Sequence, residues 1–250
     1  MTADGFHSLS DGASNIIGLI GISIAAQPKD KEHPYGHRKY ETLFSLVIAV
    51  FLFIISFNLL KDGIHRFNDQ NIPIINTKSF MVMLITLGIN LWVVNYEYKK
   101  GKLLQSDILV SDSLHTRADI FTSLSVIFAL TAMKLGLPVY IDSLVTILIA
   151  LFIAYAGYDI IKYSSAILCD TAPIVDVQKI IDIVLRINEV KTCHKIRTRG
   201  RPDEVYIDLH VQVKPDMHMD KAHKISYTIE EAIKKNLPEV TDVVVHMEPK

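Results

Sequence analysis

The sequence has 250 residues, of which 50% are hydrophobic and 21% charged, and its formal net charge is -1 at pH 7. Its mean hydropathy of +0.28 is too high for an ordinary soluble domain. This composition excludes a disordered chain and a nucleic-acid binder that works through overall basicity. Cys169 and Cys193 are the only cysteines, which excludes a small disulfide scaffold.

Charge is unevenly distributed along the chain. Long stretches between Gly12 and Ile161 carry almost no charge, whereas charged residues recur every few positions from Lys162 to Lys250. We therefore expect an α-helical multi-pass membrane domain over residues 1–165, followed by a small cytoplasmic domain over residues 166–250.

Five apolar runs are near the length of about 20 residues that a helix needs to cross a bilayer. The positively charged loops near residues 27–40 and 97–107 predict that these loops and the C-terminal domain face the cytoplasm. With five spans Met1 would then lie outside, although nothing before Gly5 resembles a signal peptide or a preceding helix. We therefore expect one more helix upstream in the native protein, so that five of six are visible. The five runs are Gly5–Ala26, Leu43–Leu60, Ser79–Tyr96, Ile108–Met133 and Ser143–Tyr158.

The hydrophilic end of the chain reads as one small α/β unit. Apolar residues recur at helical spacing in two segments and alternate in three others, in the order αββαβ, which predicts a two-layer sheet with helices on one face. The helices are expected at 174–187 and 220–236, and the strands at 194–199, 205–213 and 242–247.

Two of the apolar segments contain the same pattern, D-x2-H-x3-D. Residues four apart share a helix face, so each histidine stands over the second carboxylate of its motif. One imidazole and one carboxylate from each helix make a four-ligand N2O2 set that suits a tetrahedral ion such as zinc. The expected ligands are His7, Asp11, His115 and Asp119.

Ionisable side chains inside a bilayer cost at least about 2.5 kcal/mol each on insertion scales, which favours a shared cation or a polar cavity. The alternative is that these residues sit at frayed helix ends among lipid headgroups, and it is stronger for His7 and Asp11, near the chain start. Asp4 and Asp112 lie one turn away, where a supporting or entrance role fits better than ligation.

The paired HxxxD motifs resemble those of the cation diffusion facilitator family, proton-coupled exporters of divalent metals, and the likeness extends from Asp4 to Pro249. The resemblance implies that Gly5–Ala26 is the second of six helices and Ile108–Met133 the fifth. It also implies that the four motif residues form the transport site and that the C-terminal domain is ferredoxin-like. Members with a histidine in both helices tend to carry zinc, whereas manganese-type members usually have carboxylates or asparagine there.

The loop sequence DKEHPYGHRKYE contains Asp30, His33 and His37. Pro34 and Gly36 favour a turn that folds the two histidines towards each other. The family resemblance implies a secondary, loop-borne zinc site here. The alternative is a turn leading into a helix, with solvated histidines.

Several metal-binding residue types also occur in the C-terminal unit. Taken one at a time, each histidine is more often a surface residue than a ligand. Their positions nevertheless resemble the family's cytoplasmic binuclear zinc site at the dimer contact, with glutamate where the family often has aspartate. The residues are His194, His210, His223, His246 and Glu248.

These features together predict efflux of a divalent cation, foremost Zn2+, in exchange for protons, with Cd2+, Co2+, Fe2+ and Mn2+ as other candidate cargoes. We expect a homodimer formed through the cytoplasmic domain, in the cell (inner) membrane, with no nucleic-acid partner. The alternative is a non-transporting, metal-binding regulatory or partner subunit of the same family. An enzyme is not expected, because the N2O2 set fills a tetrahedron and no HExxH motif is present.

Overall fold

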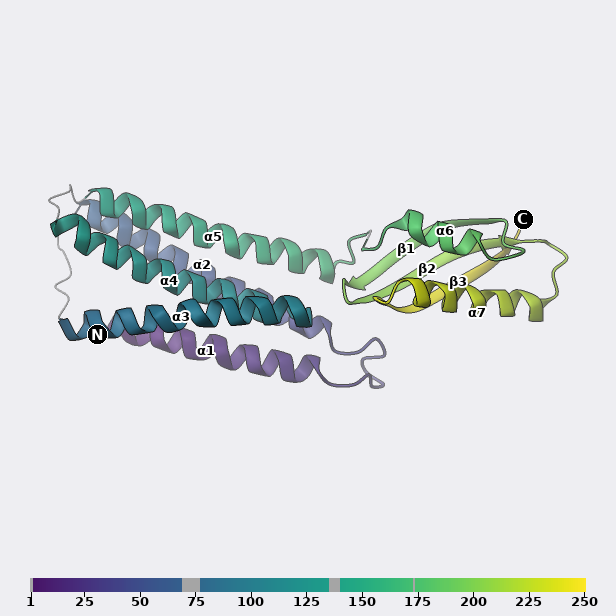
Figure 1. Ribbon diagram of the computed structural model, residues 1–250, viewed down its shortest axis with the longest axis horizontal. Helices are drawn as coiled ribbons and strands as arrows, with labels where there is room; N and C mark the ends of the chain where they lie inside the picture. The colour runs from purple at the N-terminus through teal and green to yellow at the C-terminus, as the bar shows by residue number, and fades with distance from the viewer. Residues whose placement is uncertain (1, 69–76, 135–139, 173) are drawn as a thin grey trace. The chain divides into compact units, whose positions relative to one another are not determined.

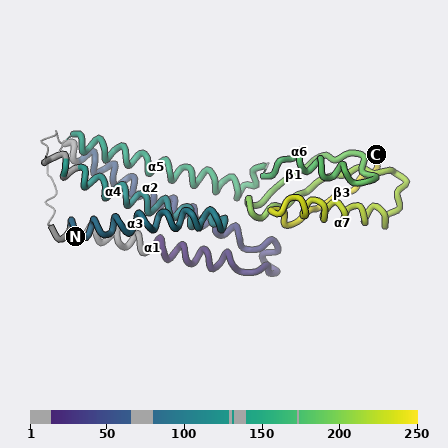
Figure 2. The backbone as a smooth tube through the Cα atoms, viewed as in Figure 1, coloured from purple at the N-terminus to yellow at the C-terminus, as the bar shows by residue number. Residues whose placement is uncertain are grey.

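The computed structural model describes the backbone of residues 2–68, 77–134, 140–172 and 174–250. Side chains are described for residues 14–65, 80–128, 131, 140–172 and 174–250 (Figure 2). The chain divides into two compact units, residues 1–164 and 165–250.

The first unit consists of long helices (Figure 1). Each of the five apolar runs lies within one helix or overlaps it over nearly its whole length, and the helices extend the predicted bounds by up to about ten residues at an end. The helices are α1 (Thr2–Ala25), α2 (Lys39–Asn68), α3 (Thr77–Leu104), α4 (Asp107–Lys134) and α5 (Tyr140–Leu168), the last of which continues into the second unit.

Three helices are long and apolar enough to cross a membrane by length and composition, within the residues that the structure describes: Lys39–His65, Phe80–Leu104 and Tyr140–Leu168. Helix α1 contributes a shorter apolar stretch, Ser14–Ala25. Helix α4 does not meet the same criterion over its described part. It carries Asp107, Asp112, Arg117 and Asp119 along its length, so its polar character reflects the motif that the sequence singled out.

Helix α4 is central to the packing, since it contacts α1, α2 and α3. A cluster of small and branched side chains from α2, α4 and α5 forms a buried core, which includes Ala49, Ala118 and Ile153. Helix α1 approaches closely at Gly21, where an added Cβ would lie 2.6 Å from Ile108 Cδ1 and 2.7 Å from Phe44 Cγ. Glycine at this position therefore allows α1 to lie against α2 and α4, as small residues do between membrane helices.

The second unit contains α6 (Val177–Leu185), β1 (Thr192–Arg201), β2 (Glu204–Val213), α7 (Met219–Asn236) and β3 (Val240–Pro249). The sheet order is β1-β2-β3, with β1 antiparallel and β3 parallel to the central β2. This is the predicted αββαβ order, and the ferredoxin-like arrangement of the C-terminal unit is confirmed.

The two faces of the sheet have different surroundings. Alternate residues of β2, from Val205 to Val213, join one buried cluster with Ile180 and Val184 of α6 and with Ile225, Ile229 and Ile233 of α7. Both helices therefore cover the same face. The remaining β2 positions, among them Asp208 and His210, project from the opposite face because successive strand residues alternate in direction.

Candidate functional site

The second copy of the D-x2-H-x3-D motif lies on α4, inside the helical unit. The His115 side chain is only 4% exposed, and Asp119 follows it by one turn on the same helix. The first copy lies on α1, but the side chains of His7 and Asp11 are outside the described part of the structure.

A hydrogen bond joins the two motif-bearing helices next to both motifs. Ser14 Oγ on α1 donates to Asp112 Oδ1 on α4 over 3.1 Å. Ser14 is three residues after Asp11, and Asp112 is three residues before His115. Helices α1 and α4 therefore contact each other one turn away from both motifs.

The helical unit also contains polar contacts between helices that the sequence did not indicate. Thr116 on α4 donates to Glu97 Oε2 on α3 over 3.2 Å, which places a second carboxylate near the histidine motif. The i, i+4 spacing of Asp107 and Ser111 with His115 and Asp119 puts these four on one ridge of α4. Asp107 and Ser111 also line a cavity of about 250 Å³ between the ends of α3, α4 and α5. The cavity is therefore lined by polar groups from the same face of α4 that carries His115.

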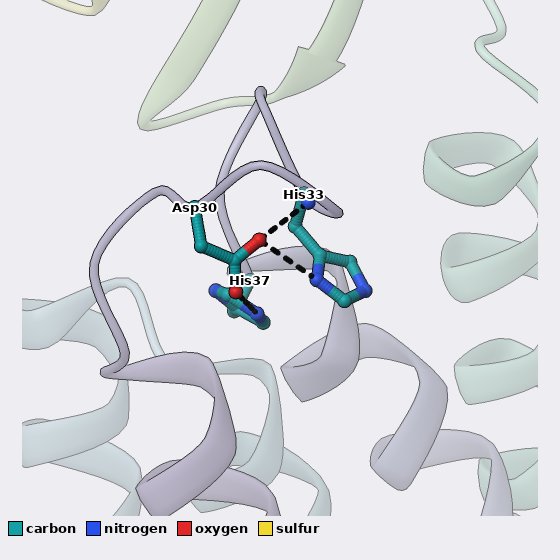
Figure 3. Close-up of side chains that lie close together, drawn as sticks. All are labelled: Asp30, His33 and His37. Carbon is teal, nitrogen blue, oxygen red and sulfur yellow. Dashed lines mark hydrogen bonds and ion pairs between the residues drawn. The ribbon is translucent and has the colours of Figure 1, made fainter.

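The loop between α1 and α2 brings Asp30, His33 and His37 together, and Figure 3 shows the Asp30 carboxylate between the two imidazoles. Asp30 Oδ1 lies 3.3 Å from His33 Nδ1, and Asp30 Oδ2 lies 3.4 Å from His37 Nε2. The two rings are 4.3 Å apart between centroids. The tight turn is supported at Gly36, whose φ of 88° is in the left-handed region that glycine adopts without strain.

Neighbouring groups hold this loop cluster in place. The backbone N–H of His33 donates to Asp30 over 2.6 Å, and this bond, together with the nearby imidazoles, lowers the pKa of the Asp30 carboxyl. The Tyr40 hydroxyl lies 3.2 Å from His33 Nε2 and orients that ring. His37 is 4% exposed, so its imidazole is held inside the protein rather than solvated.

The donor set in the loop fits a divalent cation. The nearest ligand atoms of the three residues all lie within 4.8 Å of one another. Ligand atoms about 2.0–2.1 Å from a tetrahedral zinc are about 3.4 Å apart, which is close to the two Asp30 separations above. His37 Nδ1 is buried and has no hydrogen-bond partner within the described residues. The loop therefore offers a hard oxygen and two imidazoles with little rearrangement.

The C-terminal unit aligns three histidines in one row across the sheet. His210 on β2 is the register partner of both His194 on β1 and His246 on β3. Glu248 lies two residues beyond His246 and contacts all three: Oε1 is 2.5 Å from His210 Nδ1, Oε2 is 3.2 Å from His194 Nε2, and Oε1 is 3.7 Å from His246 Nε2. The hydrogen bond from His210 is the main reason that the pKa of Glu248 lies below its usual range.

These residues stand on the sheet face that the helices leave open. The ligand atoms of His194, His210 and Glu248 fall within 4.8 Å of one another, which again fits one divalent ion. His223 is not part of this group. It is exposed on α7, which packs on the opposite face of the sheet, and its ring contacts Tyr227 with a centroid distance of 4.8 Å. The sequence placed His223 near a helix start but could not show which face that helix covers.

Comparison with known proteins connects this arrangement to a family. The sequence model of the cation efflux transmembrane domain matches residues 1–169, and the model of the cation efflux protein cytoplasmic domain matches residues 172–250. The chain belongs to the cation efflux (cation diffusion facilitator) family. It is therefore a membrane transporter of metal cations with a C-terminal cytoplasmic domain, and not an enzyme.

Relatives of this cation efflux protein are similar over nearly its whole length. An uncharacterized transporter of Methanocaldococcus jannaschii is 30% identical over 99% of this chain and 87% of its own. The manganese efflux system protein MneS of Bacillus subtilis is 28% identical over 100% of this chain and 85% of its own. A solved MamM CTD structure is 20% identical with a TM-score of 0.28 and covers 29% of this chain and 90% of that one.

Proposed function

We propose that this cation efflux protein exports zinc in exchange for protons, through a site formed by His7, Asp11, His115 and Asp119. The observation that carries the proposal is the Ser14–Asp112 hydrogen bond of 3.1 Å, because it joins α1 and α4 one turn away from both motifs. The burial of His115 at 4% exposure supports it, since a buried imidazole has little access to water and gains from a bound cation.

The donor types favour zinc over manganese as the cargo. Two imidazoles and two carboxylates suit a tetrahedral zinc ion, whereas manganese prefers sites made of oxygen ligands. Cadmium, cobalt and iron accept the same donors. MneS is named for manganese, so competition between zinc and manganese is the decisive comparison.

Proton exchange follows from the chemistry of imidazole. A histidine must be deprotonated to bind a metal, and an unperturbed imidazole titrates near pH 6.5. Protons that enter a site open to the outside would therefore release the ion, while a site open to a less acidic cytoplasm would bind it. Asp107, which lines the 250 Å³ cavity and lies about two turns before His115 on the same face of α4, would attract cations towards the site.

The loop and tail clusters would regulate transport by binding metal outside the transport site. Asp30, His33 and His37 would bind one ion in the loop, and His194, His210, His246 and Glu248 would bind cytoplasmic metal on the open sheet face. An open face that binds ions is suited to contact a second copy of the chain, so metal would bias a homodimer in the cell membrane.

The test is zinc-driven proton flux in proteoliposomes that contain the full chain. We expect His115→Ala and Asp119→Ala each to abolish exchange, because each removes a ligand of the cargo. His65→Ala is the matched control, since His65 lies exposed on α2 outside the motifs. Unchanged flux in either motif variant would contradict the assignment, and preferred exchange of manganese over zinc would contradict the cargo.

A further inference from the structure

Strand β1 contains an irregularity beside the histidine row. His194 pairs with His210 and Arg197 pairs with Asp208, and the register shifts between these pairs. Two residues of β1, Lys195 and Ile196, therefore stand opposite the single residue Leu209 of β2. This is a β-bulge, in which one extra residue is inserted into a strand of an antiparallel pair.

The bulge decides which face His194 occupies. Beyond it, Ile196 packs against the core cluster and Thr198 is buried at 4% exposure, so both point towards the helices. In a regular strand successive side chains point to opposite faces. Counted backwards from Ile196, Lys195 would then lie on the open face and His194 would point into the core. With the extra residue, His194 instead joins His210 and Glu248 on the open face, where its Nε2 lies 3.2 Å from Glu248 Oε2.

The backbone of Lys195 makes this shift. Its φ is 51°, in the left-handed region that is uncommon for residues other than glycine and asparagine. Its side chain is exposed, so core packing does not account for this conformation. Bulges of this kind are frequent next to functional sites, where they re-aim a side chain.

We propose that Lys195 is a positioning residue of the tail metal site: its left-handed backbone holds His194 on the same sheet face as His210 and Glu248. This inference rests on the proposed metal site of the tail. Lys195 does not itself bind the metal in this scheme. The metal affinity of the tail should instead depend on whether residue 195 tolerates a positive φ.

Three substitutions separate the backbone from the side chain. Lys195→Gly, Lys195→Asn and Lys195→Val all remove the ammonium group, so differences among them come from the backbone. Glycine and asparagine adopt the left-handed region readily, whereas a β-branched valine does not. We expect the valine variant to bind Zn2+ about 5- to 30-fold more weakly than the glycine variant, which corresponds to a left-handed penalty of about 1–2 kcal/mol. The asparagine variant should match the glycine variant.

The measurement is Zn2+ titration of the full chain, in a background with His37→Ala and His115→Ala that removes the other candidate sites. Circular dichroism and thermal unfolding of each variant identify any loss of folded protein, and affinities are compared well below the unfolding midpoint. A double-mutant cycle with His194→Gln then isolates the positioning role. Once that ligand is absent, the valine and glycine variants should have equal affinity.

The outcomes distinguish this inference from the proposed metal site. If His194→Gln leaves Zn2+ binding unchanged, the tail site itself is wrong. If His194→Gln weakens binding but the valine and glycine variants bind equally in the unaltered background, the role of Lys195 is wrong. A difference between valine and glycine that persists in the His194→Gln background would also overturn it, because Lys195 would then act on general stability.

Discussion

Thr42 donates a hydrogen bond of 2.6 Å to Asp107 Oδ2 and so joins α2 to the first residue of α4. Thr42 is 0% exposed and Asp107 is 9% exposed. The adjacent residues Glu41 and Ser106 form a second contact between the same segments. Two buried carboxylates, Asp107 on α4 and Glu41 on α2, thus each accept a hydrogen bond from a hydroxyl of the other segment, and α4 is the helix that carries His115.

Thr42→Val should destabilise the helical unit, because it leaves the buried carboxylate of Asp107 with one hydrogen bond fewer. We expect a loss of about 1–3 kcal/mol, measured by thermal unfolding in detergent. Ser45→Ala is the control, since the buried Ser45 hydroxyl donates only to the Glu41 carbonyl of its own helix over 3.0 Å. Equal unfolding midpoints for the two variants would show that the bond between α2 and α4 contributes no stability.

Ser14→Ala should weaken zinc exchange without removing any proposed ligand, since it breaks the contact between α1 and Asp112. Loss of an interaction that orients a metal site lowers affinity by about 10- to 100-fold, and we expect the lower end because packing at Gly21 still holds α1 against α4. The measurement is the zinc concentration for half-maximal flux in proteoliposomes. Ser125→Ala, which removes a buried hydroxyl that bonds within α4, should leave that concentration unchanged.

Tyr40→Phe should weaken zinc binding at the loop by about 10-fold, because the hydroxyl that orients the His33 ring is lost. Isothermal titration of a chain that carries His115→Ala and His194→Gln measures this site. Tyr35→Phe is the matched control, as Tyr35 is 58% exposed on the same loop. If both phenylalanine variants bind zinc like the parent chain, Tyr40 does not orient the site.

Zinc binding at the tail should depend on pH through the histidines and not through Glu248. The hydrogen bond from His210 lowers the pKa of Glu248 in the folded state, so the stability that this carboxylate contributes is present above its usual pKa of about 4.3. It is lost only as the pH falls through the lowered value. Between pH 5 and 7 the carboxylate therefore stays ionised, and only proton competition at the imidazole ligands remains as a source of pH dependence.

We therefore expect the tail affinity for zinc to fall as the pH is lowered, because protons compete with the ion for the ligating imidazoles. His194→Gln should reduce this dependence, because one competing imidazole is removed. Titrations at pH 5.5, 6.5 and 7.5, in the His37→Ala and His115→Ala background, measure both slopes. An affinity that does not change over this range would exclude imidazole ligation.

Local signals in the sequence were sufficient for the elements of the fold. The apolar runs and the alternation in the tail predicted all five long helices and the αββαβ order, because hydrophobic periodicity is a property of neighbouring residues. The loop triad was also predictable, since Asp30, His33 and His37 lie within eight residues and a turn at Gly36 suffices to bring them together.

Contacts between distant segments could not be predicted in the same way. The sequence grouped His223 with the tail cluster, but α7 packs on the sheet face opposite the histidine row. Nothing in the sequence connected Glu97 with Thr116 or Ser14 with Asp112, because such pairs depend on which helices pack together.

The sequence by itself determined which donor groups the protein possesses, their spacing along each helix, and the division into a membrane and a cytoplasmic part. Only the tertiary structure decided which of these donors meet. Helix register at Ser14 and Asp112, strand register at His194, His210 and His246, and the bulge at Lys195 all depend on packing between segments far apart in the chain. Periodicity shows which face of each helix or strand is apolar. Which elements contact each other, and in what register, is set by how their buried surfaces fit together.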